Sequence, residues 1–290
     1  MKKTDYIDTT FLKKEYALSC IENYLLVILS QKYECWQSVF SESFMRFAEV
    51  INSLGSVGYS YFKGIPRLHT TAMEQGYVQL EYIEGREVFD NSNTEYYAIM
   101  VKEEYMRERY NVKLWREDHF ILLCNKPDGT KKYLNDVPPD SGILDMSQIL
   151  KVYKNEAIIF KLSDRVFEIS EKNIKSNSCK IIDLLEISTE QVNQEFLLTN
   201  INVLRDSVGI EKVLVKRQGE YLRLFDPDYD NNEYYNFLCK IYAKIEYMRL
   251  KNASKKKILE VIEEIKSADT EYYNCVKNLL GRKENNEYGF

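Results

Sequence analysis

The chain has 290 residues and a mass of 34.4 kDa, with 40 lysines and arginines against 45 aspartates and glutamates, so its formal charge is −5. With 44% hydrophobic and 29% charged residues, the composition is that of a folded protein and excludes a disordered one. The mild acidity and the lack of a basic recognition motif argue against nucleic-acid binding. No stretch reaches the ~20 apolar residues of a membrane span, so we expect no membrane association and a cytoplasmic protein.

The first part of the chain predicts two helices and a loop. Apolar residues with the spacing of one helical face occur at Ile21, Tyr24, Leu25, Ile28 and Leu29. Ser19 and Glu22 have the spacing of a capping box, so this helix is expected to begin after Ser19. A second helix is expected over residues 42–52. The glycines and aromatic residues of 55–64 predict a loop of the kind that often lies near a binding site.

The middle of the chain predicts a β-hairpin. Residues 96–101 form one short apolar run, and residues 120–124 form a continuous one that is typical of a buried strand. Lys126-Pro127-Asp128-Gly129 is a turn signal, after which residues 131–134 predict the partner strand.

The rest of the chain changes toward helix. Residues 146–152 predict a helix and residues 156–162 a further strand. We place a boundary near residue 172, between an α+β domain over 1–172 and a mainly helical region over 173–290. Two apolar stripes support the helical assignment: Leu238, Ile241, Tyr242, Ile245 and Met248, and then Ile258, Leu259, Ile262 and Ile265.

One cysteine and one histidine carry the candidate chemistry. Cys20 opens the first predicted helix, where the helix dipole and unpaired N–H groups lower the pKa of a thiol. A nucleophilic thiol needs a base, and His119 lies at the start of a buried strand, which is a rigid position for an imidazole. The other histidine, His69, is expected in a loop. The remaining cysteines lack the spacing of a disulfide framework or a zinc site and are expected to be core thiols: Cys35, Cys124, Cys179, Cys239 and Cys275.

The turn of the hairpin decides which residue orients His119. In a symmetric four-residue turn, Asn125 pairs with Thr130 and His119 lies opposite Asp136. In a three-residue loop with a glycine bulge, the register shifts by one residue and Asn135 lies on the face of His119. The Pro-Asp-Gly sequence suits either turn.

These motifs resemble a known enzyme family. A cysteine at the start of an apolar helix, the run Asp-His-Phe-Ile-Leu-Leu at 118–123 and the run Tyr-Leu-Asn-Asp-Val-Pro-Pro at 133–139 resemble papain-fold enzymes of the bacteriocin-processing (C39-like) peptidase type. The closer likeness is to the butirosin biosynthesis protein H family. It covers roughly residues 10–165, and an amide-forming transferase of this kind acts in closthioamide assembly. The resemblance implies an α+β, papain-like fold with a helical carboxyl-terminal extension.

The resemblance also implies a reaction. Members of the family transfer an acyl group from a carrier-protein thioester to an amine in antibiotic and other specialised-metabolite biosynthesis. The implied partners are an acyl or peptidyl carrier protein, whose phosphopantetheine carries the acyl group, and a small amine acceptor; no metal or other cofactor is implied.

The implied triad is Cys20, His119 and Asp136, because the family favours an aspartate and a carboxylate stabilises an imidazolium more strongly than an amide does. Asn135 is the alternative third member. The family's glycine-rich loop is echoed by residues 55–61, and the residues expected to bind substrate there are Gly58, Tyr59 and Tyr61.

One position departs from the papain pattern. Papain-like enzymes carry a glutamine six residues before the cysteine as an oxyanion donor, and Lys14 stands there in this chain. Loss of one such donor typically costs ~3 kcal/mol of transition-state stabilisation, so we expect attack on a reactive thioester rather than peptide cleavage. The alternatives are a cysteine peptidase or amidase, and a degenerate papain-fold binding protein in which Cys20 is a core thiol.

A basic segment lies between the last two predicted helices. It contains Arg249, Lys251, Lys255, Lys256 and Lys257. Such a set is usually a solvated face, but acidic carrier proteins dock on basic patches. Lys255, Lys256 and Lys257 are therefore the expected carrier-docking residues.

Overall fold

The computed structural model describes residues 16–57, 65–89, 95–111, 118–125, 130–164, 166–187 and 194–282. The protein is α+β and forms two compact units. The first unit takes in residues 18–36 and 67–169, and the second takes in residues 37–66 and 170–290 together with Tyr16 and Ala17. The last change of unit, between Ile169 and Ser170, is close to the expected boundary near 172. Residues 37–66 were expected with the first domain but belong to the second unit.

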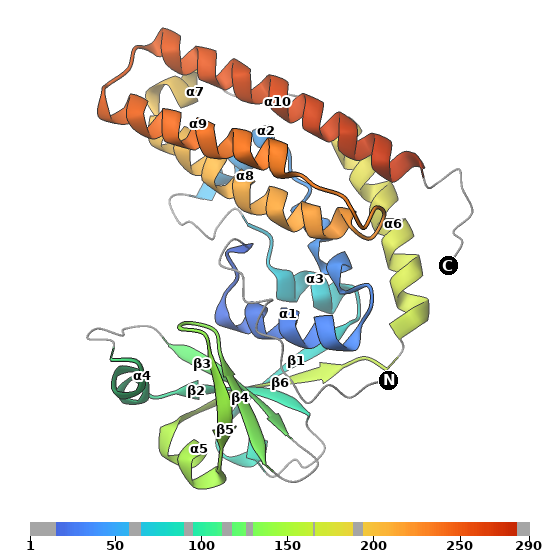
Figure 1. Ribbon diagram of the computed structural model, residues 1–290, viewed down its shortest axis with the longest axis vertical. Helices are drawn as coiled ribbons and strands as arrows, with labels where there is room; N and C mark the ends of the chain where they lie inside the picture. The colour runs from blue at the N-terminus through green and yellow to red at the C-terminus, as the bar shows by residue number, and fades with distance from the viewer. Residues whose placement is uncertain are drawn as a thin grey trace. The chain divides into compact units, whose positions relative to one another are not determined.

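The first unit contains a six-stranded antiparallel sheet with the strand order β1-β6-β2-β3-β4-β5 (Figure 1). The strands are β1 (Val78–Glu84), β2 (Tyr96–Val101), β3 (His119–Asn125), β4 (Lys131–Asn135), β5 (Asp140–Leu144) and β6 (Tyr153–Leu162). The four predicted strands are confirmed as β2, β3, β4 and β6. The sequence did not reveal β1 and β5, because they are the edge strands and carry many exposed residues in place of a continuous apolar run.

Helices cover both faces of this sheet. Alternate residues of β3, such as Ile121 and Leu123, enter a core that is completed by Met106 of α4 (Glu103–Tyr110) and Ile149 of α5 (Met146–Val152). Against the other face lies α1 (Cys20–Lys32), which contacts β3 and α3 (Leu68–Glu74). The expected helix start is confirmed, since Ser19 and Glu22 form the complete capping box.

The region after α1 differs from the expected helix over 42–52. A 3₁₀ helix spans Trp36–Ser43, and α2 then spans Phe47–Val57, so that the helix continues through Gly55, which was expected in a loop. The N–H group of Phe47 donates to Asp269 Oδ1 at 3.1 Å. The start of α2 is thus fixed by a side chain more than 200 residues away, which no local pattern reveals.

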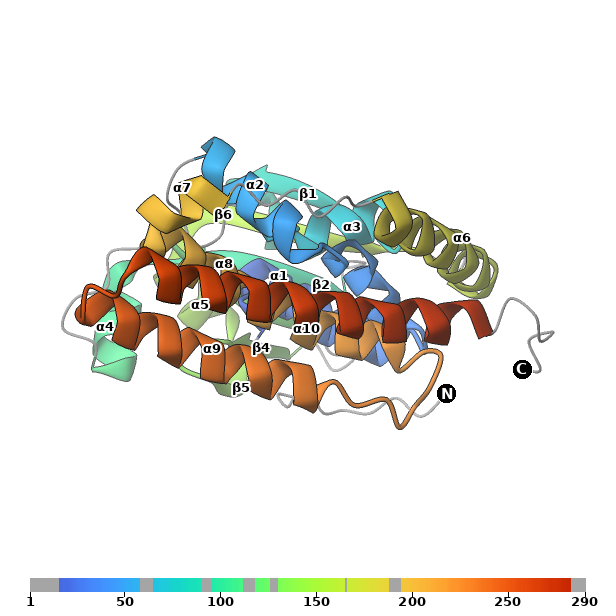
Figure 2. The ribbon, with the colours of Figure 1, turned by 90° about the horizontal axis from the view of Figure 1, so that it is seen from above.

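The second unit is mainly helical, as expected. Its other helices are α6 (Val166–Ile187), α7 (Gln194–Thr199), α8 (Ile201–Leu222), α9 (Asn232–Leu250) and α10 (Lys255–Arg282). Figure 2 shows α9 and α10 running alongside each other. Both predicted apolar stripes are buried apart from Leu259, which is exposed, and Tyr242, which is partly so. Among the described residues, no helix is long and apolar enough to cross a membrane.

A buried polar network links the helices of the second unit. Glu211 of α8 is fully buried and accepts a hydrogen bond from the hydroxyl of Tyr234 at 2.6 Å. Asp269 of α10 forms a two-nitrogen ion pair with Arg46, at 3.0 and 2.8 Å from Nε and an Nη. Burial first and the charge of Asp269 second raise the pKa of Glu211 well above its ordinary value. The network therefore favours the protonated form of the Glu211 carboxyl group.

We predict that Glu211→Gln makes stability less dependent on pH. A carboxyl group whose pKa is raised by folding stabilises the fold below its unfolded pKa, and this contribution is lost as the pH rises through the folded pKa. The free energy of unfolding of the wild type should fall relative to that of Glu211→Gln from about pH 5 upward, by at most about 1.4 kcal/mol per pH unit. Urea denaturation at pH 5, 6, 7 and 8 measures the difference.

The matched control is Glu211→Ala, which leaves the Tyr234 hydroxyl without its acceptor and should be about 1–3 kcal/mol less stable than Glu211→Gln at every pH. If the wild type instead gains stability over Glu211→Gln as the pH rises, the buried carboxyl group is ionised and the assignment is wrong.

Candidate active site

Cys20 is the first residue of α1, and its sulfur lies against the start of β3. The backbone N–H groups of Phe120, Ile21 and Cys20 lie near the sulfur and lower the pKa of the thiol. Phe120 directly follows His119 in the chain, so the predicted nucleophile and the predicted base belong to neighbouring parts of the first unit. The capping box of α1 fixes the backbone on which Cys20 sits.

The register of the hairpin is the shifted one. Leu122 pairs with Leu134 and Asn125 with Lys131, so that Asp136 falls opposite Phe120 when the ladder is extended. The expectation from a symmetric turn, that Asp136 lies opposite His119, is wrong. The turn residues 126–129 lie outside the described part of the chain, and the register alone carries this correction.

Asn135 is the hydrogen-bond partner of His119. Its Oδ1 atom lies 2.7 Å from His119 Nε2, and its Nδ2 atom donates to the carbonyl of Pro138 at 2.6 Å. Because a carbonyl only accepts, the Pro138 bond orients the amide of Asn135 with its oxygen toward the imidazole. Nε2 of His119 must then carry the proton, and Nδ1 is the ring nitrogen with the lone pair. Both side chains are buried, which holds this arrangement in place.

The next strand anchors Asn135 further. Asn135 pairs with Asp140 across β4 and β5. Oδ2 of Asp140 accepts hydrogen bonds at 2.9 Å from the hydroxyls of Tyr110 and Tyr133 and from Arg109. This set of bonds fixes the edge of the sheet beside the histidine.

Asp136 lies beside the histidine without a hydrogen bond to it. Its Oδ1 atom is 3.7 Å from His119 Nε2, whereas Oδ2 accepts from Asn23 Nδ2 at 2.9 Å. The hydroxyl of Tyr24 donates to the carbonyl of Phe120 at 2.6 Å and also lies within hydrogen-bond distance, 3.2 Å, of Asp136 Oδ1. Asn23 and Tyr24 are therefore part of the site. The sequence had assigned Tyr24 only to the apolar face of the helix, because hydrogen bonds between distant segments leave no local pattern.

The pKa of Cys20 differs from the expected one. Burial first and the nearby Asp136 carboxylate second raise the pKa of the thiol to about 11, and the N–H groups at the helix start lower it only in part. The expectation of a lowered thiol pKa is thus wrong for the protein without substrate. The helix start acts as foreseen, but the desolvation and the negative charge outweigh it.

The other expected site residues are either outside the described part of the chain or in the second unit. Gly58, Tyr59, Tyr61 and Lys14 fall outside the described residues, so the substrate loop and the departure from the papain pattern have no structural account here. Lys255, Lys256 and Lys257 are exposed at the start of α10 in the second unit.

His69 is in α3 and not in a loop. Its Nδ1 atom lies 3.3 Å from Oε1 of the buried Glu22, which also accepts from the N–H of Leu68 at 2.9 Å. His69 therefore belongs to the contact between α1 and α3, separate from the His119 hydrogen-bond network.

None of the six cysteines forms a disulfide bond. Cys275 is exposed and the others are partly exposed, so the expectation of core thiols is wrong for the five besides Cys20. Within the described residues, no group of three or more histidine, cysteine, aspartate or glutamate side chains is arranged to hold a metal ion.

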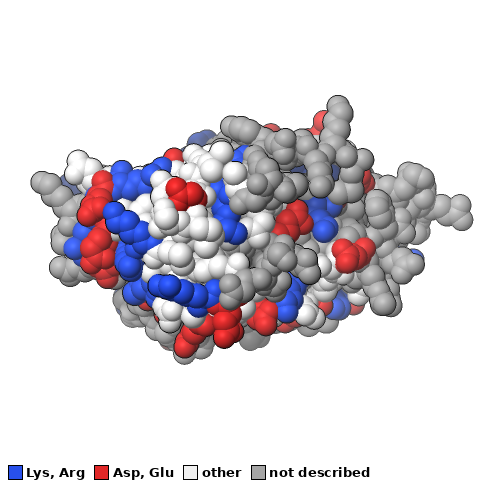
Figure 3. Space-filling view, turned by 90° about the horizontal axis from the view of Figure 1, so that it is seen from below, with Lys and Arg blue, Asp and Glu red and all other residues white. Residues whose placement is uncertain are grey.

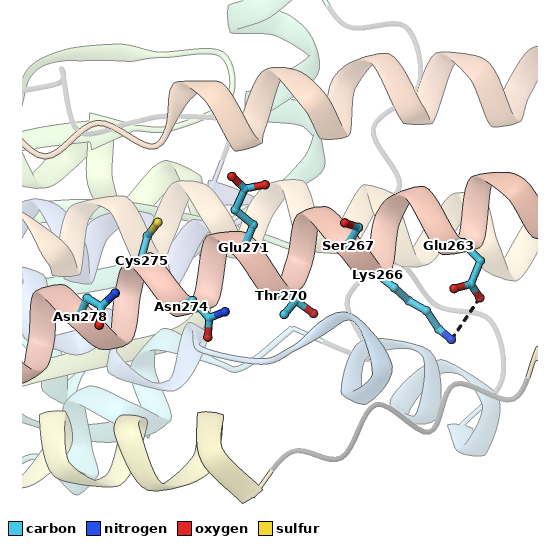
Figure 4. A pocket seen from close by; sticks show the side chains of 8 residues that line it. All are labelled: Glu263, Lys266, Ser267, Thr270, Glu271, Asn274, Cys275 and Asn278. Carbon is cyan, nitrogen blue, oxygen red and sulfur yellow. Dashed lines mark hydrogen bonds and ion pairs between the residues drawn. The ribbon is translucent and has the colours of Figure 1, made fainter.

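A polar groove of about 620 Å³ runs along α10 (Figure 4). Its described lining residues are Glu263, Lys266, Ser267, Thr270, Glu271, Asn274, Cys275 and Asn278. Lys266 pairs with Glu263 across 3.3 Å, which neutralises one end of the groove. None of the predicted catalytic residues lines it.

No family model, curated protein or solved structure matches this chain.

We predict that Cys20 reacts slowly with iodoacetamide at pH 8 and that its rate rises toward pH 11, because the thiolate is the reactive form and burial beside Asp136 raises the thiol pKa. Asp136→Asn should move the titration to lower pH, since it removes the negative charge and keeps the size of the side chain. Peptide mapping by mass spectrometry separates Cys20 from the other five cysteines. Cys275, which is exposed, serves as the internal control. A half-titration of Cys20 near pH 7, or the same titration in Asp136→Asn, contradicts the assignment.

Proposed function

We propose that the protein is a papain-like cysteine acyltransferase that moves an acyl group from a carrier-protein thioester to an amine and forms an amide. The observation that carries the proposal is the chain of hydrogen bonds from Pro138 through Asn135 to His119, beside the Cys20 thiol. A fixed imidazole tautomer next to a cysteine at a helix start is the arrangement that thiol-based acyl transfer needs. The resemblance of the sequence motifs to the butirosin biosynthesis protein H family supports a role in specialised-metabolite biosynthesis.

In the first step, Nδ1 of His119 takes the proton of Cys20 as the sulfur attacks the acyl carbon of the thioester. The new bond joins Cys20 Sγ to the acyl carbon, and the bond from that carbon to the pantetheine sulfur breaks. The pantetheine thiolate leaves with the proton from the imidazolium. The backbone N–H of Cys20 can supply one donor to the developing oxyanion.

In the second step, the amine attacks the acyl-enzyme. Nδ1 of His119 takes a proton from the amine, a C–N bond forms, and the bond between the acyl carbon and Cys20 Sγ breaks. The Cys20 thiolate then recovers its proton from the imidazolium, so the enzyme returns to its first state. Asn135 Oδ1 accepts from Nε2–H throughout and stabilises the imidazolium.

The raised pKa of Cys20 supports a thioester as the substrate. A thiol that is neutral before attack must lose its proton during the attack, which adds to the barrier. A thioester is more reactive toward sulfur nucleophiles than an amide and tolerates this cost better. The same argument disfavours the peptidase alternative.

We predict that Cys20 becomes acylated when the protein is incubated with acyl-loaded carrier proteins, and that Cys20→Ala does not. Intact-mass measurement shows the adduct, and the mass shift identifies the acyl group. Addition of a primary amine should discharge the adduct as an amide faster than water discharges it as an acid. Cys239→Ala, at another partly exposed cysteine, is the matched control and should be acylated normally. Efficient cleavage of peptides, with carrier thioesters left intact, would replace the proposal by the peptidase alternative.

We predict that Asn135→Ala lowers kcat by more than tenfold and alters its pH profile, because the imidazole loses the acceptor that fixes its tautomer. Asn135→Asp keeps an acceptor and should retain more activity. Asp136→Asn should cost less than Asn135→Ala, since Asp136 makes no hydrogen bond to the ring among the described contacts. If Asp136→Asn is the more damaging change, the carboxylate is the third member of the triad.

A second candidate function is that of a degenerate papain-fold binding protein. The raised pKa of Cys20 favours it, because a protonated thiol is a poor nucleophile. Acylation by carrier thioesters decides between the two functions. A protein that binds acyl-loaded carriers without forming an adduct at any pH between 7 and 10 is the binding protein.

A further inference from the structure

Exposed lysines and two exposed apolar side chains lie around the turn between α9 and α10. We define the α9–α10 surface as the exposed residues Tyr247, Leu250, Lys251, Lys255, Lys256 and Lys257. They lie at the end of α9, in the short turn after it and in the first turn of α10 (Figure 1). All belong to the second unit.

This surface is positively charged in an acidic protein. Between residues 247 and 259 the chain has five basic residues and no acidic one, while its formal charge as a whole is −5. Arg249 is paired with Glu246 at 3.0 Å. Within the described part of the chain, the four lysines have no ion pair or hydrogen bond of their side chains. On the face drawn in Figure 3, by contrast, basic and acidic side chains are interspersed.

The position of three of the lysines costs stability. Lys255, Lys256 and Lys257 are the first three residues of α10, where the positive end of the helix dipole repels a cation. Each unfavourable charge in a first turn typically costs a few tenths of a kcal/mol, and the lysines also repel one another. Unfavourable charges of this kind, when no contact compensates them, are expected at functional positions.

Two large apolar side chains accompany the lysines. Tyr247 is 63% exposed and Leu250 is 71% exposed. Protein interfaces combine apolar side chains at the centre with charged residues at the rim. A bare polyanion such as nucleic acid needs only the charges, and the net negative charge of the chain repels such a polymer at long range.

We propose that the α9–α10 surface docks the acidic carrier protein whose thioester is the substrate in the proposed function. The lysines meet acidic side chains of the carrier, and Tyr247 and Leu250 meet an apolar side chain between them. The inference rests on the proposed function for the identity of the partner, and on charge and exposure for the location.

The test compares two forms of the same acyl group. We expect Lys255→Glu/Lys256→Glu and Leu250→Ser each to raise KM for the acyl-loaded carrier protein about tenfold and to leave KM for the acyl-pantetheine thioester unchanged. The control is Lys240→Glu, at an exposed lysine elsewhere on α9, which should change neither value. The double variant should fold, because acidic residues in the first turn of α10 favour the helix, and its Tm should rise.

Equal effects on both thioesters, or no effect on either, overturn the docking surface and leave the acyltransferase standing. If neither thioester acylates Cys20, the proposed function fails, and binding is measured directly with purified holo acyl carrier protein of bacterial fatty-acid synthesis. Loss of that binding in the double variant, and its retention in Lys240→Glu, supports the surface. Binding to phosphatidylglycerol vesicles or to duplex DNA in place of the carrier protein overturns it.

Discussion

The candidate site depends on the hydrogen bonds of the Tyr24 hydroxyl. The hydroxyl contacts the carbonyl of Phe120 and the carboxylate of Asp136, two residues that lie opposite each other when the β3–β4 ladder is extended. The hydroxyl links Phe120 and Asp136 beyond the last printed pair of the ladder, Leu122 with Leu134. The N–H of Phe120 lies near the sulfur of Cys20. One side chain of the helix thus brings the thiol to the strand that carries His119.

Two neighbouring residues, Asn135 at the end of β4 and Asp136 directly after it, contact the imidazole of His119 in different ways. Asn135 fixes the tautomer of His119, because its own amide group is oriented by the carbonyl of Pro138. Asp136 supplies negative charge without a hydrogen bond to the ring. That charge stabilises an imidazolium, but it also disfavours the Cys20 thiolate. The arrangement therefore disfavours a preformed ion pair between a Cys20 thiolate and a His119 imidazolium.

Much of this could be predicted from local patterns, and the rest depended on distant contacts. The capping box placed Cys20 at a helix start, and the apolar run placed His119 on a buried strand; both are confirmed. The sequence limited the candidates for the partner of His119 to Asn135 and Asp136. It did not distinguish them, because Pro-Asp-Gly suits two turns that differ by one residue in register. The raised pKa of Cys20 was missed because it arises from burial and from Asp136, which is 116 residues away in the chain.

The second unit contains charged groups in two different settings, one buried and one exposed. Its interior holds the carboxyl group of Glu211 beside that of Asp269, and the cost of burying them is reduced by Arg46 and by the hydroxyl of Tyr234. The lysines at the start of α10 have no such compensation among the described residues. A buried polar network specifies how helices pack, whereas exposed lysines that oppose the dipole of their own helix do not stabilise the fold. This difference is the physical basis on which we propose the α9–α10 surface as a docking site.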